Sequence, residues 1–381
     1  MKILIAPDKF KGSLSAQEAA ERIAVGLGAG FDLRILPLAD GGEGTAEAIR
    51  VALGGSRHEL ETADPLGRRV TASYVMVTCG GDRTAIVDMS EASGLWRVAG
   101  PERDPWRAST AGTGVLIRAA WERGADRVVL GLGGSATNDG GSGMARALGY
   151  VFEDEAGREL EAIPEELSRA TRLRAPGEVL RPMIAACAQR PMIAACDVRN
   201  PLLGPEGATR VFGPQKGVGE GELDRHEDRL RHLADLVERD LGFRGRDLPG
   251  AGAAGGLGFG AMAFCGARLQ SGFGLVSELI GLPAALAEVD AVITGEGSLD
   301  RQTLNGKGPH GVAVLARSMG KTVVALAGRV EPGCGVEREF DLARAIAPEG
   351  TPVEESIARA GEWLERAAGG VSEWLRKRIP V

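Results

Sequence analysis

Short apolar segments that run into a glycine- or acid-rich loop and then into an amphipathic helix recur at both ends of this 381-residue chain. Residues 2–6 and 33–38 predict buried strands near the N-terminus, and the pattern returns at residues 290–294 and 321–327. Strand–helix–strand alternation builds a parallel sheet, because each helix carries the chain back across a face of the sheet. Both ends are therefore expected to form one doubly wound α/β domain.

The middle of the chain follows a different pattern. Residues 70–77 and 83–89 read as two paired strands, and residues 127–130 predict a strand that feeds the most glycine-rich loop. Charged and small-residue-rich helices are expected at 220–240 and 251–266. We therefore predict a mixed α/β domain at residues 71–285, inserted into a discontinuous domain of residues 1–70 and 286–381.

Charge and apolar content restrict the partners of this chain. The formal charge of −7 argues against nucleic-acid and anionic-membrane partners, because both require a basic surface. The longest apolar runs are strand-sized, and the first one is broken by Pro7 and Asp8, unlike a signal peptide. Five cysteines without a C-x-x-C pair and only four histidines disfavour a zinc site. A cytoplasmic protein is expected.

Lysine is scarce and unevenly placed. The sequence holds 7 lysines and 38 arginines among its 45 basic residues, yet four lysines lie in loops with glycine or aspartate. A compact ammonium is a point charge, whereas guanidinium is a planar fork, and phosphate sites often use the former. Chance is the alternative explanation. The pattern favours a phosphate-binding role for Lys9, Lys11, Lys216 and Lys307.

The glycine-rich segment at residues 131–143 lies between a predicted strand and a predicted helix. Backbone N–H groups at such a junction can face an anion, and the helix dipole adds to the attraction. The match of residues 131–136 to G-x-G-x-x-A is weak, since residues 256–261 match as well, and no Walker motif occurs. A loop that only packs helices is the alternative. Candidate cofactor-binding residues here and in the loop expected after residue 294 are Gly131, Gly133, Gly134, Ser135, Thr137, Asn138, Asp139 and Gly295.

Acidic residues follow several of the predicted strands, where open α/β sheets bind their ligands. Mg²⁺ needs only one or two carboxylates beside phosphate oxygens, and a hydroxyl nucleophile needs one aspartate to orient it. Each of these acids alone is better explained as a cap or a loop hydrogen-bonder, and their convergence on one edge is what favours a catalytic role. The residues concerned are Asp8, Asp40, Glu43, Asp197, Glu296 and Asp300.

The seven residues 181–187 recur at 190–196, which makes a direct repeat with a period of nine residues. Nine residues are too few for a solenoid unit, so a local duplication is the simplest account. The second copy runs directly into Asp197, and we expect it to form the strand. The first copy is expected to be a bulged or looped extension.

Taken together, the loop segments resemble the bacterial type I glycerate kinases, the family that forms 2-phosphoglycerate. The resemblance covers nearly the whole chain in order, and the duplication beside residue 197 is its one departure. It implies a Rossmann- or flavodoxin-like domain with an inserted second domain, a site in the interdomain cleft, and the use of ATP, Mg²⁺ and D-glycerate. The matching segments are PDKFKGSLSA (7–16), ADGGEGT (39–45), DPLGR (64–68), STAGTG (109–114), GLGGSATNDGG (131–141), DVRNPLLGPEGA (197–208), VFGPQKG (211–217), GAAGGLG (252–258), SGF (271–273) and GEGSLDRQTLNGKGPHGVA (295–313).

On this resemblance, the γ-phosphoryl group of ATP is expected to pass in line to a glycerate hydroxyl, mainly through positioning and charge neutralisation. Asp197 is the first choice for the base, followed by Asp8 and Asp40, and Glu296 and Asp300 are the candidates for Mg²⁺. The remaining catalytic candidates are Lys9, Lys11, Glu43, Asn200, Lys216 and Lys307.

Three alternatives stay open from the sequence. Transfer to the 3-hydroxyl would need only a shifted substrate pose. An NAD-dependent hydroxy-acid dehydrogenase would use the G-x-G-x-x-A match, and a non-catalytic sugar-acid or nucleotide sensor would bind without turnover. The sequence is compatible with either a monomer or a homodimer.

Overall fold

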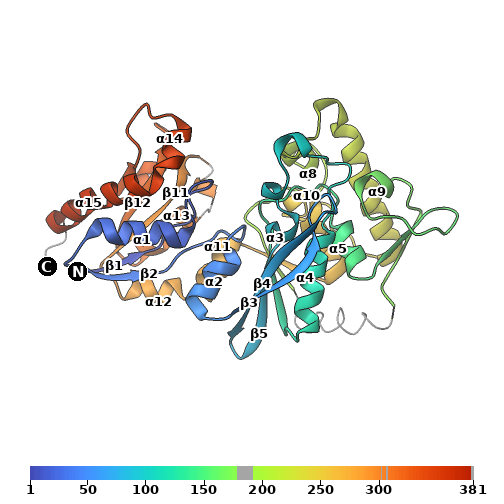
Figure 1. Ribbon diagram of the computed structural model, residues 1–381, viewed down its shortest axis with the longest axis horizontal. Coiled ribbons are helices and arrows are strands. Elements are labelled where there is room, and N and C mark those ends of the chain that lie inside the picture. The colour runs from blue at the N-terminus through green and yellow to red at the C-terminus, as the bar shows by residue number, and fades with distance from the viewer. Residues whose placement is uncertain (178–191, 302, 306–307, 379–381) are drawn as a thin grey trace. The chain divides into compact units, whose positions relative to one another are not determined.

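The computed structural model describes residues 1–177, 192–301, 303–305 and 308–378 (Figure 1). The chain forms two compact units: the first holds Met1–Asp40, Glu47–Ala52 and Phe273–Val381, and the second holds Gly41–Ala46 and Leu53–Gly272. These limits differ from the expected boundaries at 70/71 and 285/286. The strand Ser56–Ala63 (β3) pairs with the second unit's sheet, and Phe273–Leu279, most of helix α11 (Gly272–Leu279), lies in the first unit.

The first unit is built on a parallel sheet in the strand order β13–β12–β11–β1–β2. Each neighbouring pair in this order is parallel, which confirms the sheet expected from the two ends of the sequence. Buried aliphatic side chains such as Ile3, Ile5 and Ile293 form its core. The strands are β1 (Lys2–Ile5), β2 (Asp32–Ile35), β11 (Ala291–Leu299), β12 (Thr322–Val330) and β13 (Leu342–Ala345).

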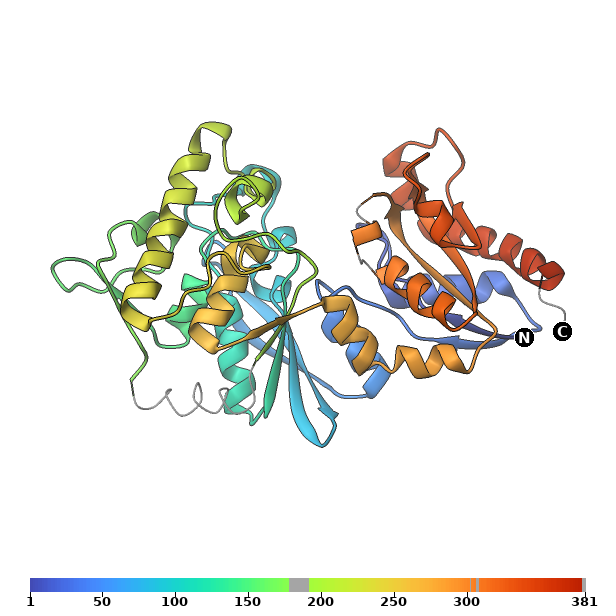
Figure 2. The same cartoon turned by 180° about the vertical axis from the view of Figure 1, so that it is seen from behind.

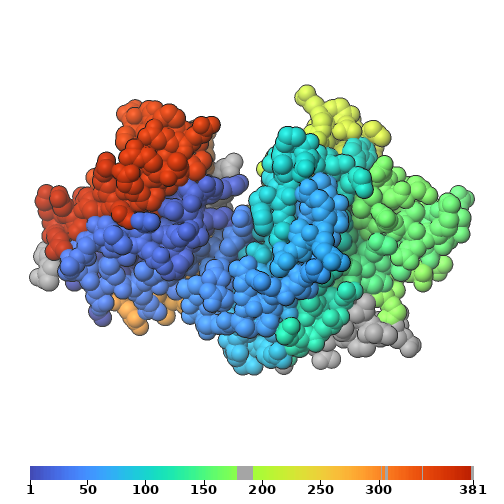
Figure 3. Space-filling view, in the orientation of Figure 1, coloured from blue at the N-terminus to red at the C-terminus, as the bar shows by residue number. Residues whose placement is uncertain are grey.

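Helices cover this sheet on both faces. Helices α1 (Ala16–Leu27) and α15 (Ala360–Arg378) pack together in front of the sheet in Figure 1, whereas α13 (Gly308–Ser318) lies in front of it in Figure 2. The contact between α1 and α15 brings the dark blue N-terminal and red C-terminal residues together in Figure 3. Ser15 and Glu18 form a capping box at the start of α1. The other helices outside the second unit's core are α2 (Thr45–Leu53), α11, α12 (Leu282–Ala287) and α14 (Val353–Ala358).

The second unit contains a mixed sheet in the order β10–β9–β6–β5–β4–β3. Its strands are parallel from β10 to β5 and antiparallel from β5 to β3. The second copy of the duplicated segment supplies β9, as expected, and the first copy lies outside the described residues. The strands are β4 (Arg69–Cys79), β5 (Asp82–Asp88), β6 (Arg127–Gly131), β9 (Ile193–Ala195) and β10 (Arg268–Gln270), and a separate hairpin joins β7 (Val151–Glu153) to β8 (Arg172–Arg174).

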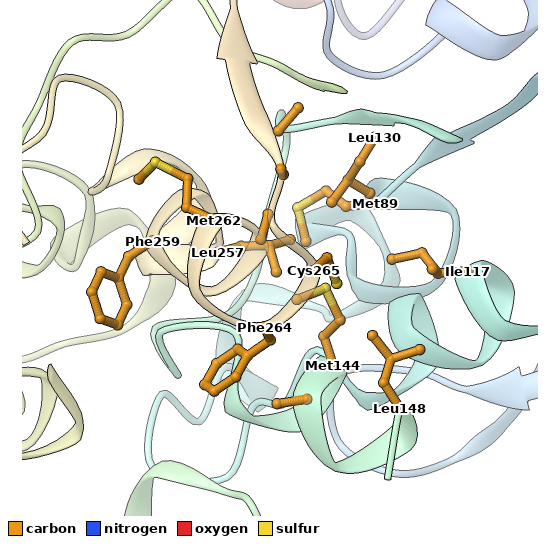
Figure 4. Close-up of a cluster of buried hydrophobic side chains, with 14 of the residues drawn as sticks. Met89, Ile117, Leu130, Met144, Leu148, Leu257, Phe259, Met262, Phe264 and Cys265 are labelled. Atoms are coloured by element: carbon orange, nitrogen blue, oxygen red, sulfur yellow. The ribbon is translucent and has the colours of Figure 1, made fainter. Parts of the chain in front are cut away.

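The core of this unit is an apolar cluster between the sheet and its helices (Figure 4). Phe259 and Phe264 of α10 and Met144 of α5 are among its buried side chains. Helix α10 starts with three consecutive left-handed residues, Ala254 to Gly256, which separate its first residue from the regular helix. The helices are α3 (Ser90–Ser93), α4 (Ala111–Glu122), α5 (Ser142–Ala147), α6 (Pro164–Leu167), α8 (Ala208–Phe212), α9 (Leu223–Leu241) and α10 (Ala253–Cys265). None of the helices in the described part of the chain is long and apolar enough to cross a membrane.

Candidate functional site

Three carboxylates lie near the ends of β1, β2 and β11 in the first unit, and the charges of two of them raise the pKa of the third. Asp8 follows β1, Asp40 follows β2, and Glu296 lies within β11. Asp8 is only 6% exposed, and its burial, followed by the charges of Asp40 and Glu296, raises its pKa to about 8. The charge of Lys9 and its backbone N–H oppose this shift. Negative charge concentrated in this way favours the binding of a cation.

Backbone contacts fix the position of Asp8. Its N–H donates to the carbonyl of Gly295 at 2.8 Å, so the end of β1 is tied to β11. Its Oδ1 accepts the N–H of Lys9 at 2.6 Å. A Cβ on Gly308, the first residue of α13, would lie 3.1 Å from Asp8 Oδ2. The buried carboxylate therefore lies against the first turn of α13.

The segment from Gly295 to Leu299 was expected to be a loop, and that expectation is wrong. These residues continue β11 and pair with β12 through Leu299. A Cβ on Gly295 would lie 2.1 Å from the carbonyl oxygen of Leu326, so glycine permits close strand packing at this position. Gly295 is therefore needed for the packing of the sheet, and its part in cofactor binding stays a prediction.

Glu296 and Asp300 are linked through one buried threonine. Thr303 Oγ1 donates to Glu296 Oε1 at 2.8 Å and accepts the N–H of Asp300 at 3.2 Å. Because Thr303 is fully buried, this link fixes the course of the chain after β11. Among the lysines expected nearby, Lys9 is half-buried and Lys11 is exposed, while Lys307 lies outside the described residues.

The glycine-rich loop of the second unit connects β6 to α5, as the sequence predicted. Gly131 and Gly133 permit close backbone approach, since Cβ atoms there would lie 2.8 Å from the Gly41 carbonyl oxygen and 2.6 Å from the Gly42 Cα. Gly134 is exposed and left-handed, with φ +68°. A Cβ on Gly134 would lie 3.8 Å from Glu43 Oε2, which places the Glu43 carboxylate beside the loop.

Lys216 reaches this loop from inside the unit. Its Nζ donates to Ser135 Oγ and to the carbonyl of Thr137, both at 2.7 Å. The side chain is 2% exposed, and burial lowers the pKa of its ammonium to about 7, against the opposing effect of Asp139. The loop lysine expected from the sequence is therefore an interior group.

Asp139 is also turned inward. Its Oδ2 accepts from the Thr110 N–H, the Thr110 hydroxyl and the Gly143 N–H at 2.8, 2.7 and 3.1 Å, and its Oδ1 accepts from the Gly141 N–H at 3.1 Å. Burial raises the pKa of this carboxyl, against the effect of those donors. These contacts join the starts of α4 and α5. Asp139 therefore has a structural role in this unit, and its part in cofactor binding stays a prediction.

The neighbouring Asn138 is likewise buried. Its Nδ2 donates to Thr209 Oγ1 at 2.9 Å, which links the loop to α8. Among the described residues, Asn138 Oδ1 and Thr137 Oγ1 are buried without a hydrogen-bond partner. Buried polar atoms of this kind usually bind water or a ligand.

Asp197 follows β9 and is half-exposed. Its Oδ1 accepts the Ser271 hydroxyl and the Gly272 N–H, both at 2.9 Å. Asn200 instead stabilises its own loop, because its Nδ2 donates to the carbonyl of Glu206 at 2.7 Å. The geometry thus separates an accessible carboxylate at 197 from a loop-stabilising amide at 200.

Sequence reasoning missed Asp88, which ends β5. Its carboxylate accepts the Gly44 N–H at 3.0 Å and the Ala46 N–H at 3.2 Å. It thereby fixes the segment before α2 that packs against Gly131 and Gly133. The sequence pattern could have identified it, because Asp88 is an acid near the end of the strand predicted at residues 83–89.

The candidate residues thus form two groups, one in each unit. The acids at 8, 40, 296 and 300 belong to the first unit, and the glycine-rich loop with Lys216 and Asp197 belongs to the second. A model of the glycerate kinase family matches residues 3–376. The chain belongs to the glycerate kinase family.

Relatives of this family match the chain along nearly its full length. A protein named glycerate kinase from Bacillus subtilis is 42% identical over 99% of this chain and 98% of its own. Glycerate 2-kinase of Escherichia coli is 42% identical over 90% of this chain and 89% of its own. A crystal structure from Salmonella typhimurium LT2, assigned as glycerate kinase 2, has 41% identity, a TM-score of 0.84 and 99% coverage of both chains.

Family membership decides between the classes left open by the sequence. A kinase takes its phosphoryl group from ATP, so the dehydrogenase and the non-catalytic sensor are set aside. Within the described ranges, no group of three or more His, Cys, Asp or Glu side chains is arranged to hold a metal by itself. Mg²⁺ beside a nucleotide needs only one or two carboxylates. Burial, followed by the charges of Asp40 and Glu296, raises the pKa of Asp8, and a nearby cation would favour its charged form.

Proposed function

We propose that this protein transfers the γ-phosphoryl group of ATP to the 2-hydroxyl of D-glycerate, forming 2-phosphoglycerate. The observation that carries this proposal is the full-length match to the glycerate kinase family, which includes a relative named for the 2-position. In this proposal the glycine-rich loop, which is held by Lys216, binds anions, and the acids at 8, 40 and 296 bind a cation.

In this proposal the loop at residues 131–143 binds phosphate oxygens. Its short helix α5 follows directly, and Gly133 and Gly134 expose backbone to an incoming ligand. Lys9 and Lys11 add positive charge in the first unit, because a loose phosphoryl-transfer transition state is stabilised by charge and position and not by covalent chemistry.

The acids of the first unit would hold Mg²⁺. Asp8, Asp40 and Glu296 are the proposed group, and Asp300 is connected to Glu296 through Thr303. Bound Mg²⁺ would neutralise negative charge on the phosphates. In its absence burial, together with the charges of Asp40 and Glu296, raises the pKa of Asp8 to about 8 and keeps it protonated near neutral pH.

Asp197 is proposed as the group that orients the glycerate hydroxyl and accepts its proton. Its exposure and the two donors to Oδ1 give it a fixed, accessible carboxylate. Asp197→Asn should lower kcat by at least about a hundredfold with little change in melting temperature, in line with the typical contribution of a general base. A near-normal kcat would transfer the role to Asp8 or Asp40.

The test of the function is release of ADP by the purified protein with ATP and Mg²⁺ in the presence of single acceptors. D-glycerate should support turnover, whereas L-glycerate, D-lactate and glycerol should support far less. Equal turnover with glycerol would contradict a hydroxy-acid substrate. Stabilisation by NADH but not by ATP in a thermal-shift measurement would contradict the kinase itself. The cytoplasmic location expected from the sequence is a further proposal, and cell fractionation tests it.

A further inference from the structure

The ammonium of Lys216 is buried, whereas a lysine that contacts a bound phosphate would be accessible to the ligand. At 2% exposure it is enclosed by the unit, and its two hydrogen bonds end on loop residues 135 and 137. Ser135 and Thr137 are themselves 7% and 0% exposed. The contacts therefore lie on the inner side of the glycine-rich loop.

The chain that carries Lys216 is fixed as firmly as the loop. Lys216 closes the 3₁₀ turn Pro214–Lys216, and its N–H donates to the Gly213 carbonyl at 2.9 Å. Arg103 Nη1 donates to the Gln215 carbonyl, also at 2.9 Å. The ammonium thus projects from an anchored turn and can hold the loop in place.

Some backbone groups of the loop are hydrogen-bonded within the unit, and others are not. The carbonyl of Gly134 accepts the Leu95 N–H at 2.7 Å, and the N–H of Ala136 donates to the Ser93 carbonyl at 3.0 Å. The N–H groups of Gly133 and Gly134 have no hydrogen-bond partner among the described residues. These two groups remain available to an anion once the loop is held in this conformation.

Burying an ammonium is costly, and this chain uses lysine sparingly. Burial alone accounts for the fall of the Lys216 pKa, and an arginine, the usual cation of this sequence, has a planar fork that would need more acceptors and space. We therefore expect the Lys216 ammonium to order the groups that accept its hydrogen bonds, or to supply charge beside them. What it touches is the loop.

We propose that Lys216 is a positioning residue, which holds residues 135 and 137 so that the N–H groups of Gly133 and Gly134 face the ATP phosphates, and that it does not contact ATP itself. The proposal rests on the kinase function proposed above. It replaces the expectation, drawn from the sequence, that this lysine neutralises the triphosphate directly.

A double-mutant cycle between Lys216→Met and Ser135→Ala tests the proposal, with the KM for ATP as the readout. Lys216→Met should raise this KM at least tenfold and Ser135→Ala about threefold, with the KM for D-glycerate unchanged. Because both act on the same loop contact, the double variant should resemble Lys216→Met alone. Fold-changes that multiply would overturn the proposal.

Hydrogen exchange in the absence of ATP separates positioning from direct contact. Lys216→Met should speed exchange of the Ala136 amide, which donates to the Ser93 carbonyl, at least tenfold, whereas loss of a lysine that touches only phosphate would leave that exchange unchanged. Lys321→Met is the matched control, since Lys321 Nζ is exposed and donates to a single carbonyl, that of Ala287, at 3.1 Å.

The remaining outcomes are also decisive. If Lys216→Met does not fold, Ser135→Ala alone should still speed exchange of the Ala136 amide and raise the KM for ATP, and unchanged values for both would refute the proposal. If the unmodified protein does not phosphorylate glycerate, the proposed function fails, while the exchange measurement still decides whether Lys216 orders the loop.

Discussion

Replacing Asp139 by alanine should destabilise the second unit strongly, because one carboxylate joins the starts of two helices. Its four donors are the N–H and hydroxyl of Thr110, before α4, and the N–H groups of Gly141 and Gly143, at the start of α5. Each buried donor left without an acceptor costs about 1 kcal/mol at the low end, which gives about 4 kcal/mol for the four.

Burial of the charged carboxylate offsets part of this gain, as the raised pKa of Asp139 indicates. A net loss of about 3 kcal/mol is expected, and a unit of this size melts about 2–4 °C lower for each kcal/mol lost. Asp139→Ala should therefore lower the Tm of the second unit by about 6–12 °C, as followed by calorimetry and urea titration. Asp139→Asn keeps one acceptor oxygen and should fall in between.

Asp228→Ala is the matched control, since the Asp228 side chain is 70% exposed and should change the Tm by no more than about 1 °C. The reasoning would be refuted if Asp139→Ala melted like the unmodified protein while its KM for ATP rose tenfold or more. That result would make Asp139 a nucleotide ligand, as the loop sequence suggested.

Three further predictions concern the buried acid Asp8, the left-handed Gly255 and the cap of α1. The pKa of Asp8 is about 8 in the native state and 3.8 in the unfolded state, so between these pH values only the native state keeps the proton, and the free energy of unfolding falls as pH rises. Asn cannot ionise, so Asp8→Asn should gain stability relative to the unmodified protein as pH rises from 5 to 9, as measured by urea titration. Gly255→Ala, at φ +69° with its Cβ 1.8 Å from the Thr137 carbonyl oxygen, should displace that lysine-bound carbonyl and raise the KM for ATP about tenfold in steady-state assays. Ser15→Ala removes the capping box with Glu18 and should cost about 1 kcal/mol in the free energy of unfolding, with no change in KM.

Local patterns were sufficient to predict much of the fold. The second copy of the duplicated segment forms β9, as expected, because it precedes Asp197 in an apolar run. Such features depend on neighbouring residues, so periodicity and capping patterns reveal them. The boundary between α14 and α15 at Arg359, with φ of −110°, has no such pattern in the sequence.

Features that depend on distant residues could not be predicted in the same way. The glycines at 295 and 297 suggested a loop, but Gly295 is required by the approach of Leu326, which lies on another strand. The sequence identified Lys216 as an unusual point charge, yet its burial follows from contacts with Ser135 and Thr137, which are about eighty residues away. Composition shows that a charge is present, and only packing shows which side of the loop it occupies.

Phosphorylation of D-glycerate at the 2-hydroxyl can be decided by ³¹P NMR of the product. Incubation of the purified protein with ATP, Mg²⁺ and D-glycerate should give one new phosphate ester resonance, that of 2-phosphoglycerate, together with ADP. A 3-phosphoglycerate resonance would contradict the position of transfer, and the absence of any new ester from folded protein that binds ATP would contradict the assignment of glycerate as the acceptor.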